Sequence, residues 1–345
     1  MTRQIMVGKT AIGGSAPVSI QSMLNTKTTD VDACLRQIRE LADAGCQIVR
    51  LAVPDLPAAD ALKELCPHSP LPLVADIHFD YRLALRAAEN GIAKIRINPG
   101  NIGGEDRVRA VAEVCRDRHI PIRIGVNGGS LDRAILEKYG KPTPQALVES
   151  AFKHLELLEK QSFTDVCVSM KSSSVPLMMQ AYRLFSEKSD YPLHLGVTET
   201  GTEYMGTVKS AMGIGGLLCM GIGDTIRVSL TAEPVREVLA AKAILQAAGL
   251  RKEGVQIIAC PTCGRTRIDL IGLAQKVEQA LAGCKKNLTV AVMGCVVNGP
   301  GEARQADIGI AGGEGCGVIF RRGEMLEKLP YEQLLPRLLS YVEQM

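Results

Sequence analysis

The chain has 345 residues and a net charge of +3 at pH 7, with no tryptophan and few aromatic residues, which argues against a nucleic-acid-binding protein. No apolar run is long enough for a membrane helix, and the first residues lack the apolar core of a signal peptide, so we expect a cytoplasmic chain without membrane association. The length suits one large α/β domain followed by a smaller domain.

Up to about Gly249 the chain alternates short β-type segments with amphipathic helical segments. A small hairpin over residues 2–17 is expected to plug the bottom of the fold. The rhythm predicts a (β/α)8 barrel over residues 1–249, because an open doubly wound sheet would bring glycine-rich phosphate motifs that are absent. The expected strands are Val18–Met23, Gln47–Val53, Pro72–Phe79, Ala93–Asn98, Pro121–Val126, Asp165–Met170, Pro192–Thr198 and Asp224–Leu230.

A short polar linker, Leu250–Gly254, ends this pattern, and a compact α+β domain is expected over residues 250–345. Its predicted elements are a strand ending at Cys260, a helix over Leu270–Leu281, a strand over Leu288–Met293, shorter strands near Ile308 and Val318, and a last helix near Tyr331–Val342.

Polar residues gather at the C-terminal ends of the predicted barrel strands, where barrels carry their chemistry. Buried parallel strands are normally apolar, so several cations at one end predict an anionic ligand with two phosphates or similar charge. Among the acidic and imidazole groups, Asp76, His78 and Glu199 are candidate acids or bases, or groups that orient others. The candidates are Arg50, Asp76, His78, Arg96, Asn98, Arg123, Asn127, Lys171, Glu199, Arg227 and Ser229.

Eleven cysteines in a chain without a signal peptide indicate metal or redox chemistry rather than disulfides. Cys260 and Cys263 form a CxxC pair, and Cys295 is followed by Glu302 after a Gly-Pro-Gly turn. The spacing is compatible with zinc, with a thioredoxin-like dithiol, or with a [4Fe–4S] cluster held by three thiolates and a weaker fourth ligand. Cys316 competes with Glu302 for that fourth position.

Several motifs in chain order resemble the family of 4-hydroxy-3-methylbut-2-enyl diphosphate synthases of the bacterial methylerythritol phosphate pathway. The resemblance covers essentially the whole chain. The short linker matches the two-domain bacterial form, because the plant-type form carries a large insert there. The motifs are Gln21–Met23, Asp76–Arg82, Arg96–Gly103, Ile124–Asn127, Pro192–Glu199, Gly221–Ser229, Ala259–Gly264 and Gly294–Glu302.

The resemblance implies reductive ring opening and dehydration of 2-C-methyl-D-erythritol 2,4-cyclodiphosphate. It also implies one [4Fe–4S] cluster per chain on Cys260, Cys263, Cys295 and Glu302, whose fourth iron binds the substrate. The substrate-binding residues it implies are Arg50, Arg96, Asn98, Arg123, Lys171, Arg227 and Ser229. The residues it implies around the carbon skeleton are Asp76, His78, Asn127 and Glu199, with Glu199 as the preferred proton donor.

The resemblance further implies a head-to-tail homodimer, and a linker of about five residues, which spans at most about 18 Å, agrees with that expectation. We expect an acidic flavodoxin or ferredoxin to deliver the electrons, guided by basic residues near the cysteines. Those residues are Arg265, Arg267, Lys285, Lys286 and Arg304.

Two other classes remain open at this point. One is a redox-independent phosphate-binding barrel, such as an aldolase or a pterin-synthase-like transferase, with a purely structural cysteine domain. The other is a zinc-ribbon protein that binds nucleic acid, which the single CxxC pair disfavours.

Overall fold

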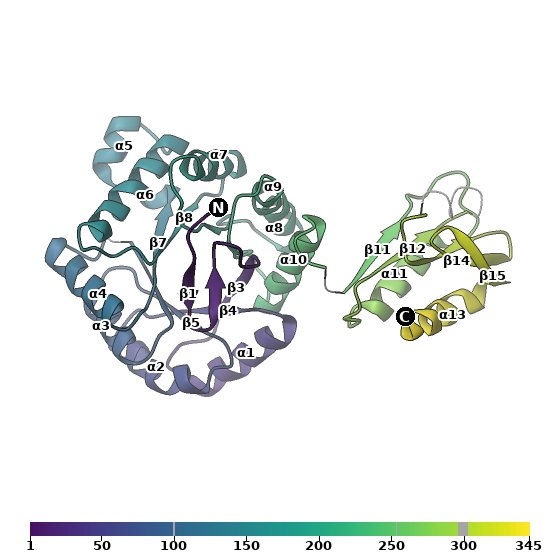
Figure 1. The fold of residues 1–345 in the computed structure, drawn as a ribbon, viewed down its shortest axis with the longest axis horizontal. Coiled ribbons are helices and arrows are strands. Elements are labelled where there is room, and N and C mark those ends of the chain that lie inside the picture. The colour runs from purple at the N-terminus through teal and green to yellow at the C-terminus, as the bar shows by residue number, and fades with distance from the viewer. Residues whose placement is uncertain (99–100, 253, 296–302) are drawn as a thin grey trace. The chain divides into compact units, whose positions relative to one another are not determined.

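The computed structural model describes residues 1–98, 101–252, 254–295 and 303–345. These residues fall into two compact units, Met1–Leu250 and Arg251–Met345 (Figure 1). Within the described residues, no helix is long and apolar enough to cross a membrane.

The first unit is a parallel β-barrel, which confirms the predicted fold. Its sheet order is β8-β7-β6-β5-β4-β3-β10-β9, and a bridge between Val168 and Leu193 joins the two ends. The strands are β3 (Ser19–Met23), β4 (Ile48–Ala52), β5 (Leu73–Asp76), β6 (Lys94–Ile97), β7 (Ile122–Asn127), β8 (Val166–Lys171), β9 (His194–Leu195) and β10 (Thr225–Ile226).

The last two strands are much shorter than predicted. The regular ladder stops near Gly196, although the backbone N–H of Arg227 still donates to the carbonyl of Leu195 at 3.0 Å. Further along, the backbone N–H of Leu230 donates to the side chain of Glu237 instead of a neighbouring strand. At Leu230 a side-chain acceptor thus takes the place of a neighbouring strand, and backbone pairing resumes where the N–H of Thr231 donates to the carbonyl of Gly201 at 3.0 Å.

Helices surround the strands of the barrel (Figure 1). Their N-termini follow the capping rules: Asp30 caps α1, and Thr143 caps α6 ahead of Pro144. The helices are α1 (Val31–Ala44), α2 (Leu56–His68), α3 (Tyr81–Glu89), α4 (Glu105–Asp117), η1 (Gly128–Ser130), α5 (Arg133–Tyr139), α6 (Pro144–Glu159), α7 (Val175–Ser186), α8 (Glu203–Ser210), η2 (Ala211–Gly215), α9 (Gly216–Cys219) and α10 (Pro234–Ala247).

The two faces of the barrel strands differ sharply in polarity. Outward residues such as Ile20, Ile95 and Ile226 pack in the large apolar core beneath the helices. The alternate residues point into the barrel, and many of them are polar or charged. The bottom is closed by the predicted hairpin of β1 (Ile5–Val7) and β2 (Thr10–Ile12), which packs on inward residues of β4, β5 and β8.

In the described residues of the second unit, five strands form a sheet of order β11-β12-β13-β14-β15, which is accompanied by the helices α11 and α13. The first three strands are parallel, and β14 and β15 are antiparallel. The last strand was not predicted, because its charged and apolar residues do not alternate. The elements are β11 (Val255–Ala259), α11 (Leu270–Leu281), β12 (Leu288–Met293), β13 (Ile308–Gly312), β14 (Cys316–Arg321), β15 (Glu324–Pro330) and α13 (Tyr331–Gln344).

Candidate active site

The mouth of the barrel gathers the cations predicted from the sequence. Arg50 on β4, Arg96 on β6 and Arg123 on β7 have the parity of the inward-facing residues. Lys171 ends β8, and Arg227 directly follows β10. Burial lowers the pKa of Lys171 well below its ordinary value, and the four neighbouring guanidinium groups lower it further. The structure thus places the five predicted cations in one electrostatic group.

Asp76, the last residue of β5, lies within this group. Its Oδ1 accepts a hydrogen bond from Arg96 Nη1 at 3.0 Å, and its Oδ2 lies 3.8 Å from Arg50 Nε. Burial alone would raise the pKa of Asp76, but neighbouring cations, Arg50 first among them, lower it. Asp76 therefore remains a carboxylate near neutral pH, which suits it to orienting two arginines rather than to donating a proton.

Several guanidinium donors in the mouth have no partner among the described residues. These buried atoms are Nε of Arg96, Nε and Nη1 of Arg123, and Nε of Arg227. Arg123 is only 1% exposed, and burial followed by repulsion from nearby arginines lowers its pKa to about 9. Buried charged donors without partners are costly. A ligand with several anionic oxygens would satisfy them, and phosphate oxygens match the fork of arginine.

Two glycines leave the space that these cations occupy. A Cβ at Gly125 on β7 would lie 2.7 Å from Nη2 and 2.9 Å from Cζ of Arg96. A Cβ at Gly196, just after β9, would lie 2.7 Å from Nζ of Lys171. Neither glycine has a positive φ. Glycine is therefore needed at these positions because a side chain would clash with the cations, and not because of the backbone conformation.

The remaining predicted residues lie around the rim. Asn98 is buried just after β6, whereas His78 is exposed after β5 and contributes to lowering the pKa of Asp76. Asn127 accepts a hydrogen bond from the backbone N–H of Gly129 at 3.2 Å and so caps η1. Glu199 is exposed with a φ of 54°, a left-handed conformation that is strained for a residue with a side chain.

One carboxylate in the site was not predicted from the sequence. Glu237 on α10 is 4% exposed and forms an ion pair with Arg227, from Oε1 to Nη2, at 3.1 Å. The other Nη of Arg227 donates to Ser229 Oγ, so the structure brings this predicted pair together. A signal was present, because Glu237 falls among the apolar residues that form the buried face of its helix.

The barrel interior below the mouth is also polar. Lys94, two residues before Arg96 on β6, is fully buried, and its Nζ has no hydrogen-bond partner among the described residues. Burial lowers the pKa of Lys94 to about 8. The parity shared with Arg96 could have identified this inward lysine from the sequence.

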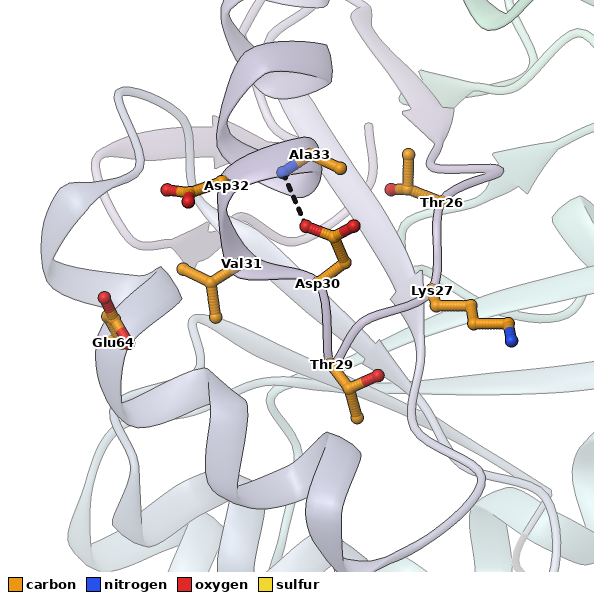
Figure 2. A pocket seen from close by; sticks show the side chains of 8 residues that line it. All are labelled: Thr26, Lys27, Thr29, Asp30, Val31, Asp32, Ala33 and Glu64. Atoms are coloured by element: carbon orange, nitrogen blue, oxygen red, sulfur yellow. Dashed lines mark hydrogen bonds between the residues drawn. The ribbon is translucent and has the colours of Figure 1, made fainter.

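A separate hollow in the barrel unit lies away from this site. It measures about 670 Å³ and surrounds the N-terminus of α1 (Figure 2). Its lining includes Asp30, Asp32 and Glu64, and Asp30 accepts the hydrogen bond from the backbone N–H of Ala33 at 3.0 Å. These three carboxylates outnumber the one cation of the lining, Lys27, so the hollow suits an anion less well than the mouth does.

In the second unit, two predicted cysteine ligands lie at the same edge of the sheet. Cys260 directly follows β11, and Cys295 lies two residues after β12. These strands are parallel neighbours, with Ala259 beside Val292. The backbone N–H of Gly294 donates to Cys260 Sγ at 3.2 Å, so the two loops touch. Backbone donors to sulfur are typical of thiolate ligands in iron–sulfur proteins.

The other cysteines of this unit lie at different edges of the sheet. Cys263 is exposed, and hydrogen bonds from the backbone and side chain of Arg265 lower the pKa of its thiol. Cys316 begins β14, which runs antiparallel to β13, so it lies at the same edge as Cys260. Cys284 precedes β12 and therefore lies at the opposite edge.

Among the residues that the structure describes, no three histidine, cysteine or acidic side chains are grouped closely enough to hold a metal ion. Glu302, the predicted fourth ligand, lies outside the described residues.

The basic residues predicted to flank the cysteines also lie at two different edges of the sheet. Arg265 and Arg267 follow Cys263, and the backbone N–H of Arg267 donates to the carbonyl of Gly294 at 3.1 Å. Lys286 instead precedes β12 and donates to carbonyl oxygens of Val342 and Glu343 at the end of α13. The prediction that Lys285 and Lys286 flank the cysteines is therefore wrong, because six residues of β12 separate the two edges.

A closed parallel barrel, with buried arginine donors at its mouth that find no partner in the described part of the chain, defines an α/β-barrel protein built for an anionic ligand. The chain matches the family models described as "GcpE TIM-barrel domain" over residues 2–242 and "GcpE protein C-terminal domain" over residues 256–344. The chain belongs to the GcpE family.

Similar curated proteins share nearly their whole length with this chain. The 4-hydroxy-3-methylbut-2-en-1-yl diphosphate synthase (flavodoxin) of Clostridium perfringens is 59% identical over 99% of this chain and 98% of its own. The protein of the same name from Caldanaerobacter subterraneus is 58% identical over 100% of this chain and 97% of its own. These relatives extend the family assignment to both units.

Solved structures with the same barrel have little sequence in common with the chain. Dihydropteroate synthase from Yersinia pestis is 13% identical with a TM-score of 0.51, over 73% of this chain and 100% of its own. Type I 3-dehydroquinate dehydratase from Clostridium difficile is 14% identical with a TM-score of 0.53, over 71% of this chain and 97% of its own. At this identity the likeness concerns the fold alone.

Proposed function

We propose that the chain is a 4-hydroxy-3-methylbut-2-enyl diphosphate synthase, which opens the ring of 2-C-methyl-D-erythritol 2,4-cyclodiphosphate reductively and releases water. The family, and relatives of that name at 58–59% identity over the full length, support this identity. The observation that carries it is the group of buried guanidinium donors at the barrel mouth that no described residue satisfies. A cyclic diphosphate has the anionic oxygens that these donors require.

The proposed reaction balances when a dianionic cyclodiphosphate takes up two electrons and one proton and yields a trianionic linear diphosphate and water. The product thus carries one more negative charge than the substrate. The cations at the mouth stabilise the charge that develops on the departing phosphate oxygen. Asp76 holds Arg50 and Arg96 in place. Arg123, on the barrel wall, offers N–H donors that no described residue satisfies.

Glu199 is the proposed proton donor. It is exposed at the rim in a strained left-handed conformation, and such strain is concentrated at functional positions. His78 and Asn127 belong to the same rim and are proposed to contact the carbon skeleton. Asn98 and Ser229 are proposed to join the cations in binding the diphosphate.

The proposed cofactor is a [4Fe–4S] cluster held by Cys260, Cys263, Cys295 and Glu302. Two of these thiols share one edge of parallel strands, and the sulfur of Cys260 already accepts a backbone N–H, so the donor set fits a cluster. When bound, the cluster would supply electrons singly and a Lewis-acidic iron at its fourth position. Cys316, at the same edge, is the alternative fourth ligand.

A head-to-tail homodimer is proposed to bring the cluster domain of one chain over the mouth of the other. In a βα-barrel, α10 leads from the mouth towards the opposite end, and its 14 residues are about 21 Å long. The linker spans at most about 18 Å, so reaching its own mouth is difficult. Tyr204, Val208 and Met212 form an exposed apolar stripe along α8 and η2 that would suit a second copy.

Sedimentation of the full chain tests this assembly. A dimer that becomes a monomer in Tyr204→Glu/Met212→Glu would support the stripe as the interface. A wild-type monomer that turns over normally would contradict the homodimer.

The proposed electron donor is an acidic flavodoxin or ferredoxin that approaches the edge bearing the cysteines. Arg265 and Arg267 lie at that edge, whereas Lys285 and Lys286 lie at the other and serve as matched controls. Arg267→Glu should slow turnover with flavodoxin and leave turnover with a small neutral reductant intact; Arg265 is kept, because its side chain bonds to Cys263. Lys285→Glu is the control, and an effect equal to that of Arg267→Glu would contradict this surface.

The activity itself is tested with the cluster-loaded full chain, the cyclodiphosphate and reduced flavodoxin, followed by phosphorus NMR. The expected result is loss of the cyclic signals and growth of linear diphosphate signals, with Arg123→Met strongly impaired. Conversion that persists without iron and reductant would contradict the proposal and favour a redox-independent barrel.

A further inference from the structure

Glu237 is an acidic residue on the buried face of a barrel helix. The buried residues of α10 include Pro234, Val238, Ala241 and Leu245, and Glu237 lies among them. A carboxylate at such a position costs free energy unless charges and hydrogen bonds compensate it. Its retention at a core position therefore calls for specific partners.

The partners of Glu237 lie at the barrel mouth. Its Oε1 accepts from Arg227 Nη2 at 3.1 Å and from the backbone N–H of Leu230 at 3.0 Å. Its Oε2 accepts from the hydroxyl of Ser22 on β3 at 3.1 Å. The carboxylate thus joins the end of β3, the segment after β10 and the guanidinium of Arg227.

These bonds fix the orientation of Arg227. One Nη donates to Glu237 and the other donates to Ser229, while the buried Nε has no partner among the described residues. Because the guanidinium is planar, two held corners determine the direction of the third N–H. The Nε donor is left for a ligand at the mouth.

We propose that Glu237 is a positioning residue for the anion site: it acts through Arg227, holding that guanidinium so that its Nε–H faces a phosphate oxygen of the ligand. The identity of the ligand rests on the proposed function, whereas the positioning of Arg227 rests on the contacts of Glu237 alone. Glu237 itself does not touch the ligand in this proposal, and its effect should vanish when Arg227 is removed.

Calorimetric binding of inorganic pyrophosphate to the full chain tests the proposal without requiring turnover. Glu237→Ala removes three hydrogen bonds and should weaken binding about 10- to 100-fold, the effect of losing one charge-assisted contact. Glu237→Gln keeps an oxygen for Arg227 and Leu230 and should stay within about threefold of wild type. Glu237→Asp keeps the charge but retracts it by one methylene, and should weaken pyrophosphate binding by about the same 10- to 100-fold. It serves as the test variant if Glu237→Ala does not fold.

The matched control is Glu149→Gln. Glu149 also accepts from a cation and a hydroxyl, Lys138 Nζ and Tyr139 OH, each at 2.7 Å, but it lies on the exposed side of α6. Its pyrophosphate affinity should equal that of wild type.

A double-mutant cycle with Arg227→Met separates positioning from a general structural role. In the Arg227→Met background, Glu237→Asp should change pyrophosphate affinity less than twofold, because the residue through which it acts is gone. A folded Glu237→Asp or Glu237→Ala chain that binds pyrophosphate like wild type would overturn the proposal, as would an undiminished effect in the Arg227→Met background. A wild-type chain that binds no pyrophosphate would overturn the diphosphate site and this role with it, whereas cyclodiphosphate turnover by wild type reports on the proposed function separately.

Discussion

Replacing Gly125 by alanine tests the geometry of the cationic mouth most locally. The new Cβ would lie 2.7 Å from Nη2 and 2.9 Å from Cζ of Arg96, and closer still to its Nε. Ordinary contact needs about 3.5 Å, so the guanidinium must move by about 1 Å to clear the new Cβ. That movement breaks the 3.0 Å hydrogen bond from Arg96 Nη1 to Asp76.

The expected loss follows from that bond. A hydrogen bond involving charged groups contributes about 1.5–3 kcal/mol, which corresponds to an increase of about 10- to 150-fold in KM for the cyclodiphosphate or in Kd for pyrophosphate. The fold should survive, because the atoms that clash are the end of a flexible side chain and alanine suits a strand better than glycine.

Gly128→Ala is the matched control, since its Cβ would meet nothing nearer than 3.7 Å. Steady-state kinetics and a thermal melt on both variants check the expectation. A folded Gly125→Ala chain with unchanged KM and Kd would refute the placement of Arg96 in the binding site, and equal losses in both variants would refute the steric argument.

Two further outcomes follow from the site. Glu199→Gly should remove the strain at a φ of 54° and raise the free energy of unfolding by about 1 kcal/mol while abolishing turnover; a thermal melt with unchanged or lower stability would contradict the strain. The depressed pKa of Lys171 should rise when an anion binds, so binding takes up protons and pyrophosphate affinity falls as pH rises between the free and bound pKa values. Calorimetry in buffers of different ionisation heat should show an uptake in wild type that is reduced in Lys171→Met, and equal uptake in both would exclude this lysine.

The barrel and its cationic mouth could be predicted because their signals are local in sequence. Arg50, Arg96 and Arg123 each interrupt an apolar strand at the same end, and βα-barrels place those ends together. The family motifs then gave the ligand a chemical identity. The predicted elements of the second unit were also close, as with the helix over Leu270–Leu281, whose bounds match α11.

What the sequence did not reveal depends on contacts between distant residues. Glu237 lies ten residues from Arg227 on a different element, and only the packed fold shows that a helix carboxylate reaches the mouth. Lys286 is near Cys295 in sequence, yet β12 carries the chain from one edge of the sheet to the other between them. The glycines of the site, such as Gly125, have no side chain, so their role appears only from what fills the space beside them.

The proposed iron–sulfur cluster is tested first by the metal content of the anaerobically purified chain. Iron and sulfide should be measured with the absorption spectrum on wild type, on Cys295→Ser, and on Cys284→Ser as a control from the opposite edge of the sheet. We expect a brown protein with about four irons and four sulfides per chain, lost or reduced in Cys295→Ser and retained in Cys284→Ser. A colourless wild-type chain that holds one zinc ion would contradict it.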